Sequence, residues 1–416
     1  MRSVREAIET VVAGVHRLGD EEVPLPDALD RVLAEDVESP LDLPARTNSA
    51  MDGYAVRSAD VRGATADAPR RLRIVEEVQA GCLPSRALGP GETTRIFTGA
   101  AIPEGCDGVV RQEDTARDGD AVAVRDDRDA GRNLRFAGED LRRGERVFGA
   151  GTALGPAQLG VLASVAKARV RVVRRARVGI LASGDEIADL DEREAIVTGA
   201  KTASSNSYTL GALVRRAGAE PVMLGIAKDT LDDVREHFAG GFASCDLVVS
   251  TAGVSVGEHD YVHAALEALG IEKGFWRVRM RPGSPLAFGT VRGVPWIGLP
   301  GNPVSTMVCF ELFVRPAIRK MQGHTALYRR AVPAVTDERV TTHGRLTHFL
   351  RAVVREEGGV YRARLTGPQG SGILTSMALA NALLVVSEDR NDVPAGETLP
   401  AIPLEDGWPP SEVPPV

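Results

Sequence analysis

The stretch Val178-Gly179-Ile180-Leu181-Ala182-Ser183-Gly184-Asp185-Glu186 indicates the fold class of this chain. It is an apolar run of strand length, residues 178–182, that ends in glycine and carboxylates. Three similar runs follow at 221–226, 246–250 and 294–299. Strands that alternate with helices predict right-handed crossovers and a parallel or mostly parallel α/β sheet.

Two helices are expected between these strands. Apolar residues recur at helical spacing from 210 to 217, where Gly218 ends the pattern, and from 231 to 238, after Thr230 as N-cap. A further amphipathic helix is expected within residues 3–18, because Ser3 and Glu6 form a capping-box pattern at its start.

Outside this region the sequence consists mainly of short apolar runs separated by Gly, Pro and Asp, a pattern that favours β structure. Glu357-Gly358-Gly359 is expected to be a hairpin turn, and residues 117–128 an exposed polar loop. The expected domains are a discontinuous linking domain (1–22 and 141–176), a β-rich module (23–140), the α/β domain (177–325), a small C-terminal β domain (326–405) and a disordered tail (406–416).

Bulk properties exclude several function classes. The 416-residue chain has a formal net charge of −7, which argues against general nucleic-acid binding. It contains no stretch of roughly 20 apolar residues, so no membrane span is expected and a cytoplasmic location follows by default. Its four cysteines are far apart and are expected to be buried apolar residues.

Every expected strand of the α/β domain ends in a loop with polar groups, mostly with glycine. The loops are 183–186, the segment at Asp229, 251–260 and 300–305. In open α/β sheets ligands bind at the carboxyl ends of the strands, and glycines let backbone N–H groups approach a phosphate or oxyanion. A ligand site is therefore expected at this edge.

Charged residues near these loops suggest how an anion would be held. Arg277, Arg279 and Arg281 alternate and would share one face of a strand, either as a solvated face or as an anion clamp. Loop carboxylates would suit Mg²⁺ bound next to phosphate if they converge. His259 and His263 are expected to be a surface pair and not a zinc site, since no third ligand is indicated.

Several longer motifs run in order along the chain and are more specific than one glycine loop. They are Asn48-Ser49-Ala50-Met51-Asp52-Gly53-Tyr54-Ala55, 98–100 with 103–107, 138–140, 183–186, 253–261 and 299–305. Over residues 3 to 400 they resemble the molybdopterin molybdenumtransferase family, represented by bacterial MoeA and the E domain of gephyrin.

The resemblance implies a four-domain, elongated subunit that forms a homodimer. It implies a transferase reaction in which adenylylated molybdopterin and molybdate give molybdenum cofactor and AMP, with Mg²⁺ assisting. The α/β domain would be similar to the fold of the partner molybdopterin adenylyltransferase. The active cleft would be shared, with the β-rich module of one subunit facing the α/β domain of the other.

Site residues follow from the resemblance position by position. Those implied to be catalytic are Asp52, Thr98, Asp140, Glu186, Asp229, Asp260 and Arg281. Of these, the implied metal ligands are Glu186, Asp229 and Asp260. Those implied to bind the cofactor are Gly184, Asp185, Gly253, Ser255, Val256, Gly257, Glu258, Arg279, Ser284, Pro300, Gly301, Asn302, Pro303 and Ser305.

The chain departs from the family pattern in several places, and Arg281 and Ser284 stand where the family usually has lysines. An alternative function is therefore a non-catalytic paralogue that binds, stores or delivers the cofactor. A second alternative, outside the family, is a sugar- or nucleotide-phosphate enzyme that uses the same strand-end loops.

Overall fold

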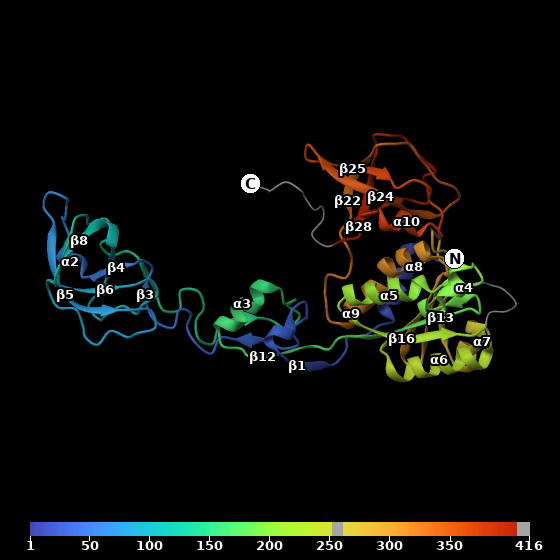
Figure 1. Ribbon diagram of the computed structural model, residues 1–416, viewed down its shortest axis with the longest axis horizontal. Helices are drawn as coiled ribbons and strands as arrows, with labels where there is room; N and C mark the ends of the chain where they lie inside the picture. The colour runs from blue at the N-terminus through green and yellow to red at the C-terminus, as the bar shows by residue number, and fades with distance from the viewer. Residues whose placement is uncertain (252–260, 406–416) are drawn as a thin grey trace. The chain divides into compact units, whose positions relative to one another are not determined.

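The computed structural model describes residues 1–251 and 261–405 of the chain (Figure 1). Two compact units are present: unit 1 contains residues 1–21, 30–32 and 172 onward, and unit 2 contains 22–29 and 33–171. The sequence predicted four domains, which is a finer division than these two units. The boundaries between the four domains stay a prediction. No helix within the described ranges is long and apolar enough to cross a membrane.

A six-stranded sheet forms the centre of unit 1, and its order is β16-β13-β17-β21-β20-β18. Its first four strands are parallel to one another, and β20 runs antiparallel to both of its neighbours, β21 and β18. The strands are β16 (Glu220–Ala227), β13 (Arg177–Ser183), β17 (Leu247–Thr251), β21 (Val294–Leu299), β20 (Ala287–Val291) and β18 (Glu272–Phe275). The mostly parallel α/β sheet expected from the sequence is confirmed.

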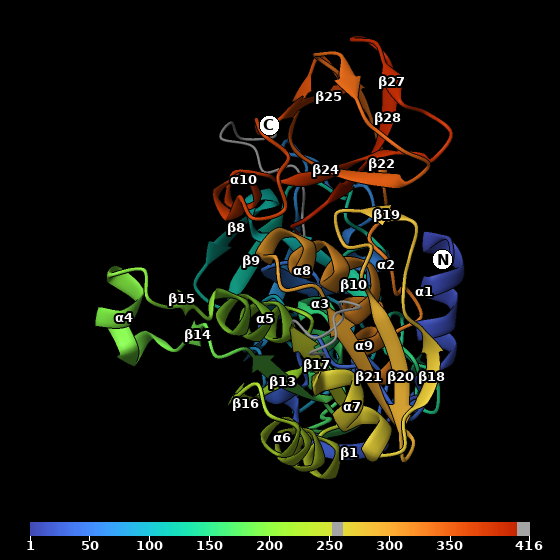
Figure 2. The ribbon, with the colours of Figure 1, turned by 90° about the vertical axis from the view of Figure 1, so that its right-hand side faces the viewer.

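Helices cover both faces of this sheet (Figure 2). One face packs against α1 (Val4–Ala13), α5 (Ser205–Arg216), α8 (Pro303–Cys309), the π-helical turn η4 (Phe310–Val314) and α9 (Arg315–Met321). The other packs against α6 (Leu231–Ser244) and α7 (Tyr261–Ala268). Side chains alternate accordingly, since Val178 and Ile180 face the first set and Leu181 faces the second.

The expected helix ends are confirmed. Ser3 Oγ accepts from Glu6 N at 3.3 Å, and Glu6 Oε2 accepts from Ser3 N at 2.8 Å, which completes the capping box. Thr230 caps α6, and Gly218, with φ of +83°, follows α5. A positive φ suits glycine at the end of a helix.

The C-terminal part of unit 1 is a small closed β-barrel. Its strands pair in the cycle β24-β25-β22-β28-β26, and β26 pairs with β24 again. They are β24 (Thr347–Glu357), β25 (Val360–Leu365), β22 (Val332–Thr336), β28 (Thr398–Pro403) and β26 (Ala382–Val386), with α10 (Leu374–Ala378) beside them. Gly358 and Gly359 have φ of +59° and +79° between the paired strands, which confirms the expected hairpin.

Unit 2 contains a second six-stranded sheet, in the order β7-β4-β6-β5-β9-β8. These strands are β7 (Gly108–Arg111), β4 (Gly53–Val56), β6 (Glu92–Ile96), β5 (Arg70–Val78), β9 (Ala121–Val124) and β8 (Thr115–Asp118). The remaining elements include α2 (Ser58–Val61), α3 (Pro156–Ser164), the pair β2 (Val37–Glu38) with β11 (Arg146–Phe148), and the pair β3 (Asn48–Ser49) with β10 (Leu134–Arg135). β12 (Arg169–Val173) pairs with β1 (Asp20–Pro24).

The loop expected at residues 117–128 is wrong. Within it β9 pairs with both β5 and β8, and its Val122 and Val124 are fully buried. The charged residues that suggested a loop lie at the turn and at the ends of the strands, whereas the short apolar centre enters the core.

Candidate functional site

The carboxyl ends of the parallel strands meet at one edge of the unit 1 sheet. Ser183 at the end of β13 lies beside Ala227 at the end of β16, and Thr251 of β17 lies beside Leu299 of β21. The loops that follow β13, β16 and β21 therefore emerge next to one another. The loop after β17 lies outside the described residues, and with it the predicted site residues Gly253, Ser255, Val256, Gly257, Glu258 and Asp260.

Three carboxylates lie at the ends of β13 and β16. Asp185 Oδ1 accepts from the backbone N–H of Asp229 at 3.2 Å, and Asp229 Oδ2 accepts from that of Asp185 at 3.4 Å. Glu186 folds back over Gly184, where a Cβ would lie 2.6 Å from both of its carboxylate oxygens. Gly184 also has φ of +133°, so only glycine fits this turn. The structure thus brings together predicted residues of two different strand ends.

The loop after β21 is held by side chains from the start of α5 and from α8. Asn206 Nδ2 donates to the carbonyl of Gly301 at 2.8 Å, and Thr306 Oγ1 donates to the carbonyls of Pro300 at 2.6 Å and Asn302 at 3.1 Å. Ser305 is buried beneath this loop with 3% of its surface exposed. It is therefore placed to support the loop and not to contact a ligand at its tip.

Asn206 and the barrel loop at Ser371 belong to this edge but were missed from the sequence. Asn206 Oδ1 is buried and has no hydrogen-bond partner among the described residues. The carbonyl of Ser371 accepts from Val304 N at 3.1 Å, which joins the barrel loop to the start of α8. Asn206 could have been predicted as a site residue, because it is a polar residue at the start of a helix beside the carboxyl edge of the sheet. No local pattern pointed to Ser371.

The expected strand with three aligned arginines is wrong. Only β19 (Met280–Arg281) is a strand there, and it pairs with β24 of the barrel instead of continuing β18. Arg279 Nε donates to Glu388 at 3.0 Å and its Nη1 to the carbonyl of Met1 at 3.1 Å. Pairing with Glu388 is also the main reason why the pKa of Arg279 is raised. Arg279 is thus engaged within the protein and does not form an anion clamp with its neighbours.

Arg281 and Ser284 lie in the same segment. Arg281 is exposed at the end of β19, so its charge is available to a ligand. Ser284 Oγ donates to the carbonyl of Val278 at 3.0 Å and stabilises the turn. The position that has lost the family lysine therefore has a local structural role.

Unit 2 carries the remaining predicted residues. Asp52 Oδ1 accepts from the backbone N–H of Thr98 at 2.7 Å and from its hydroxyl at 2.8 Å. These two bonds lower the pKa of the exposed Asp52 carboxyl, and the nearby charge of Arg95 adds to the effect. Asp140 is exposed, and its backbone N–H donates to the carbonyl of Leu43 at 3.0 Å.

Arg95 supports the Asp52 turn and was not predicted as a site residue. Its guanidinium lies 4.9 Å from the ring centre of Tyr54 and 5.1 Å from that of Phe97. It also donates to the carbonyl of Gly53 at 3.3 Å, the residue after Asp52. This packing fixes the backbone that presents the carboxylate.

The described residues contain no zinc-type site. No cluster of three His, Cys, Asp or Glu residues suited to a metal occurs there. His259 lies outside the described residues, and the ring of His263 packs edge-on against Trp276. The predicted metal set Glu186, Asp229 and Asp260 stays a prediction, because Asp260 also lies outside.

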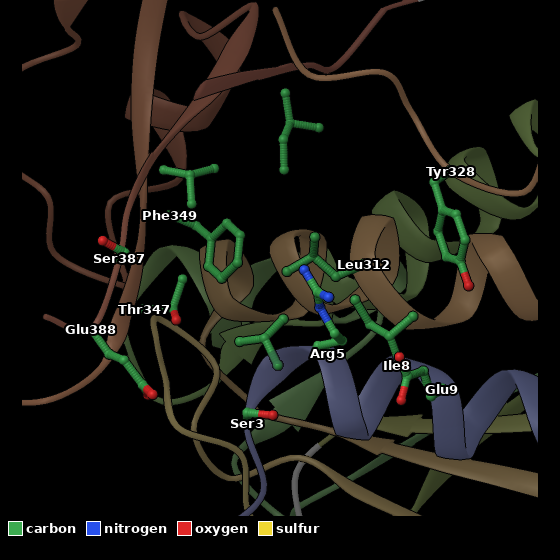
Figure 3. A pocket seen from close by; sticks show the side chains of 13 residues that line it. Ser3, Arg5, Ile8, Glu9, Leu312, Tyr328, Thr347, Phe349, Ser387 and Glu388 are labelled. Carbon is green, nitrogen blue, oxygen red and sulfur yellow. The ribbon is translucent and has the colours of Figure 1, made fainter. Parts of the chain in front are cut away.

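A larger cavity of about 590 Å³ in unit 1 is separate from the strand-end loops (Figure 3). Ile8 of α1, Leu312 of η4 and Phe349 of the barrel point into it. None of the residues that line it belongs to the loops after β13, β16 or β21. The strand-end carboxylates Asp185, Glu186 and Asp229 therefore lie outside this cavity.

Comparisons with known proteins agree along the whole chain. Residues 2–166 match the MoeA N-terminal region (domains I and II), 179–320 a probable molybdopterin-binding domain, and 333–404 the MoeA C-terminal region (domain IV). A molybdopterin molybdenumtransferase from a Nostoc species is 36% identical, covering 96% of this chain and 91% of the relative. Molybdopterin molybdenumtransferase 2 of Mycobacterium tuberculosis is also 36% identical, with 96% and 98% covered.

A solved structure shows the same fold. The molybdopterin biosynthesis MoeA protein of Pyrococcus horikoshii superimposes with a TM-score of 0.82 at 30% identity, covering 97% of this chain and all of that one. Sequence, domain matches and structure thus agree. The chain belongs to the MoeA family of molybdopterin molybdenumtransferases.

Proposed function

We propose that this protein transfers molybdenum to molybdopterin in molybdenum cofactor biosynthesis. Its substrates would be adenylylated molybdopterin and molybdate, and its products molybdenum cofactor and AMP. The observation that carries the proposal is the set of adjacent strand-end loops, with Asp185, Glu186 and Asp229 on one side and Gly301 on the other. The names of full-length relatives at 36% identity support the same reaction.

Mg²⁺ fits the carboxylates of this edge. Mg²⁺ binds oxygen donors and commonly uses one or two carboxylates together with substrate phosphates. Asp185 and Asp229 each accept a long backbone bond, at 3.2 and 3.4 Å, so both carboxylates retain capacity for a further ligand. Asp229 and Glu186 would hold the ion, which when bound would neutralise charge on the departing phosphate.

The chain's own residues would act mainly by positioning and by charge. Backbone groups of the 300–303 loop, fixed by Asn206 and Thr306, would orient the pterin end of the substrate. Arg281 would stabilise developing negative charge, since its guanidinium is exposed at the end of β19. By resemblance, Asp52, Thr98 and Asp140 would face the active cleft from the β-rich module.

Three further features are proposed from the family resemblance. The protein would act as a homodimer in the cytoplasm. It would receive its substrate from a molybdopterin adenylyltransferase, because that substrate is already adenylylated.

The test is AMP release from adenylylated molybdopterin with Mg²⁺, in the presence and absence of molybdate. Asp229→Asn should reduce molybdate-dependent release by about a hundredfold or more, because it removes charge at the proposed metal site. Asp232→Asn is the matched control, since Asp232 is an exposed acid on α6 that pairs only with Arg235 among the described residues. Its activity should equal that of the wild type.

Two outcomes would contradict the proposal. Substrate binding without any AMP release would indicate the non-catalytic cofactor-binding alternative. Equal activity in both variants would remove Asp229 from the reaction.

A further inference from the structure

Unit 2 contains a cavity of about 430 Å³ that none of the predicted site residues lines. Three loops enclose it: the segment before β3, the loop between β5 and β6, and the loop between β6 and β7. Its lining is mainly polar and includes Arg46, Arg86 and Glu104. Ala101 also lines it and directly follows the predicted turn 98–100. The volume lies within the usual range of small-molecule pockets.

Hydrogen bonds hold the three loops against one another. Ile102 N donates to the carbonyl of Thr47 at 3.1 Å, and Leu88 N donates to the carbonyl of Glu104 at 2.8 Å. Gly105, with φ of +86°, lies so close to Leu88 that a Cβ would be 2.9 Å from its carbonyl oxygen. The walls are therefore fixed before a ligand binds, and such preorganisation lowers the entropy cost of binding.

Two arginines suit the cavity to an anion. Arg46 is exposed, and its guanidinium has no ion-pair partner among the described residues. Arg86 shares a single carboxylate, that of Glu92, with Arg73, and both distances are 2.6 Å. One negative charge thus serves two guanidinium groups, so Arg86 keeps capacity for a further anion. A guanidinium binds phosphate well, because it can donate two parallel hydrogen bonds to it.

Glu104 is the acceptor of the cavity. Its side chain is exposed, and its carboxylate makes no hydrogen bond or ion pair within the described part of the chain. A carboxylate can accept two hydrogen bonds side by side from a planar group that carries an amino N–H next to a ring N–H. The 2-amino-4-oxo ring of a pterin presents this pair of donors. A ring with an oxo group in place of the amine does not.

An exposed aromatic ring lies beside the cavity. Phe136 has 61% of its surface exposed. Continuing the pairing of β10 with β3 by one residue sets Phe136 opposite Thr47, and Ala137 N donates to Thr47 Oγ1 at 3.2 Å. Opposed residues of antiparallel strands share a face, and Thr47 lines the cavity. Phe136 thus offers a flat surface on which a heterocyclic ring can stack.

We propose that this cavity binds the pterin ring and phosphate of molybdopterin. Glu104 accepts from the amino edge of the ring, and Phe136 stacks on its face. Arg46 and Arg86 bind the phosphate. This inference rests on the proposed function for the identity of the ligand. It assigns pterin recognition by side chains to unit 2, in addition to the backbone contacts proposed for the 300–303 loop of unit 1.

The experiment measures equilibrium binding of three probes to the full chain through the fluorescence of the pteridine ring. The probes are 6-hydroxymethylpterin, its monophosphate, and 6-hydroxymethyllumazine, which has an oxo group in place of the 2-amino group. Wild type should bind the pterin about tenfold or more tightly than the lumazine, because the lumazine loses a hydrogen bond to a charged group. The monophosphate should bind more tightly than the unphosphorylated pterin.

Each variant should affect one feature of the ligand. Glu104→Gln should weaken pterin binding about tenfold and leave lumazine binding nearly unchanged. Glu38→Gln is the matched control, because Glu38 is an exposed acid of unit 2 outside the cavity, and it should bind all probes like the wild type. Arg46→Gln should weaken the monophosphate but not the unphosphorylated pterin. Phe136→Leu should weaken all three probes about fivefold or more, and Phe136→Trp should restore binding.

Three results would overturn the assignment: no binding of the monophosphate by wild type, equal affinity for pterin and lumazine, or the same pterin affinity in Glu104→Gln as in Glu38→Gln. Turnover of adenylylated molybdopterin separates this inference from the proposed function. AMP release by wild type, together with unaltered probe binding in Glu104→Gln, would remove the pterin site and leave the function. Probe binding that Glu104→Gln weakens, in a protein that never releases AMP, would remove the function and leave the site.

Discussion

At the scale of single residues, His324 is a half-buried base that should make stability depend on pH. Burial lowers its pKa to about 4 from 6.5, and the charges of Arg319 and Arg315 act in the same direction. Between these values the unfolded chain binds a proton that the folded chain does not, so stability rises with pH and is lost as pH falls through this window. His324→Gln should flatten that dependence.

The measurement for His324 is the thermal midpoint of unit 1 at several pH values between 4 and 7. His16→Gln is the control, because His16 is an exposed residue and its replacement should leave the wild-type pH dependence in place. Parallel curves for both variants would mean that His324 does not titrate as proposed.

Single residues could be predicted where their function depends on near neighbours in sequence. The Ser3 cap and the helix end at Gly218 follow from local chemistry. The pairing of Arg279 with Glu388 does not follow from local chemistry, because the two residues are 109 positions apart. The alternation of arginines in the sequence gives no sign of whether Arg279 has such a partner. Local spacing predicts which side chains could share a face, but a distant partner decides whether they are available.

At the scale of elements, Arg351 of β24 links the barrel to the candidate site. It is fully buried, and its guanidinium donates to the carbonyls of Pro368, Gln369 and Gly370 at 3.3, 3.1 and 2.9 Å. The next residue of that loop, Ser371, accepts from Val304 N at the start of α8. The buried arginine thus holds a loop that contacts the site edge.

Arg351→Met should destabilise the barrel by about 3 kcal/mol or more, because each buried carbonyl left without a donor costs roughly 1–3 kcal/mol. The measurement is hydrogen exchange, which should accelerate at residues 366–373 and at Val304 N. Arg355→Met in the same strand is the control, since Arg355 is half-exposed and its ion pairs with Asp337 and Glu357 contribute little. Equal exchange in the two variants would show that Arg351 does not hold the loop.

The elements that could be predicted are those with a strong pattern of their own. The four parallel strands, helices α5 and α6 and the hairpin turn at 357–359 each carry an apolar run or a glycine turn. β9 is short and pairs with β5 from a distant segment, and β19 covers only two residues of the strand that the arginine alternation suggested. Pairing with distant segments sets the extent of both strands, so the sequence alone missed β9 and made β19 too long.

At the scale of the whole molecule, the predicted catalytic residues are divided between the two units. Asp52, Thr98 and Asp140 belong to unit 2, and Glu186, Asp229 and Arg281 belong to unit 1. The family resemblance implies that the two sets meet across a homodimer. Position in the sequence could assign each set to its unit, but it could not show which chain completes which site.

Mixed dimers decide this point. If each site uses Asp52 of one chain and Asp229 of the other, a dimer of one Asp52→Ala chain and one Asp229→Asn chain retains one intact site of two. It should therefore show on the order of half the wild-type AMP release, while each variant homodimer is inactive. Two differently tagged chains, co-expressed and purified through both tags, provide this species.

The reciprocal dimer pairs a wild-type chain with a chain that carries both substitutions. With sites shared between chains, each of its sites contains one defect, so it should be inactive. With sites confined to one chain, the pattern inverts: the wild-type chain keeps about half of the activity, and the first mixed dimer has none. Because the two arrangements predict opposite results from the same two substitutions, differences in folding or expression cannot imitate either one.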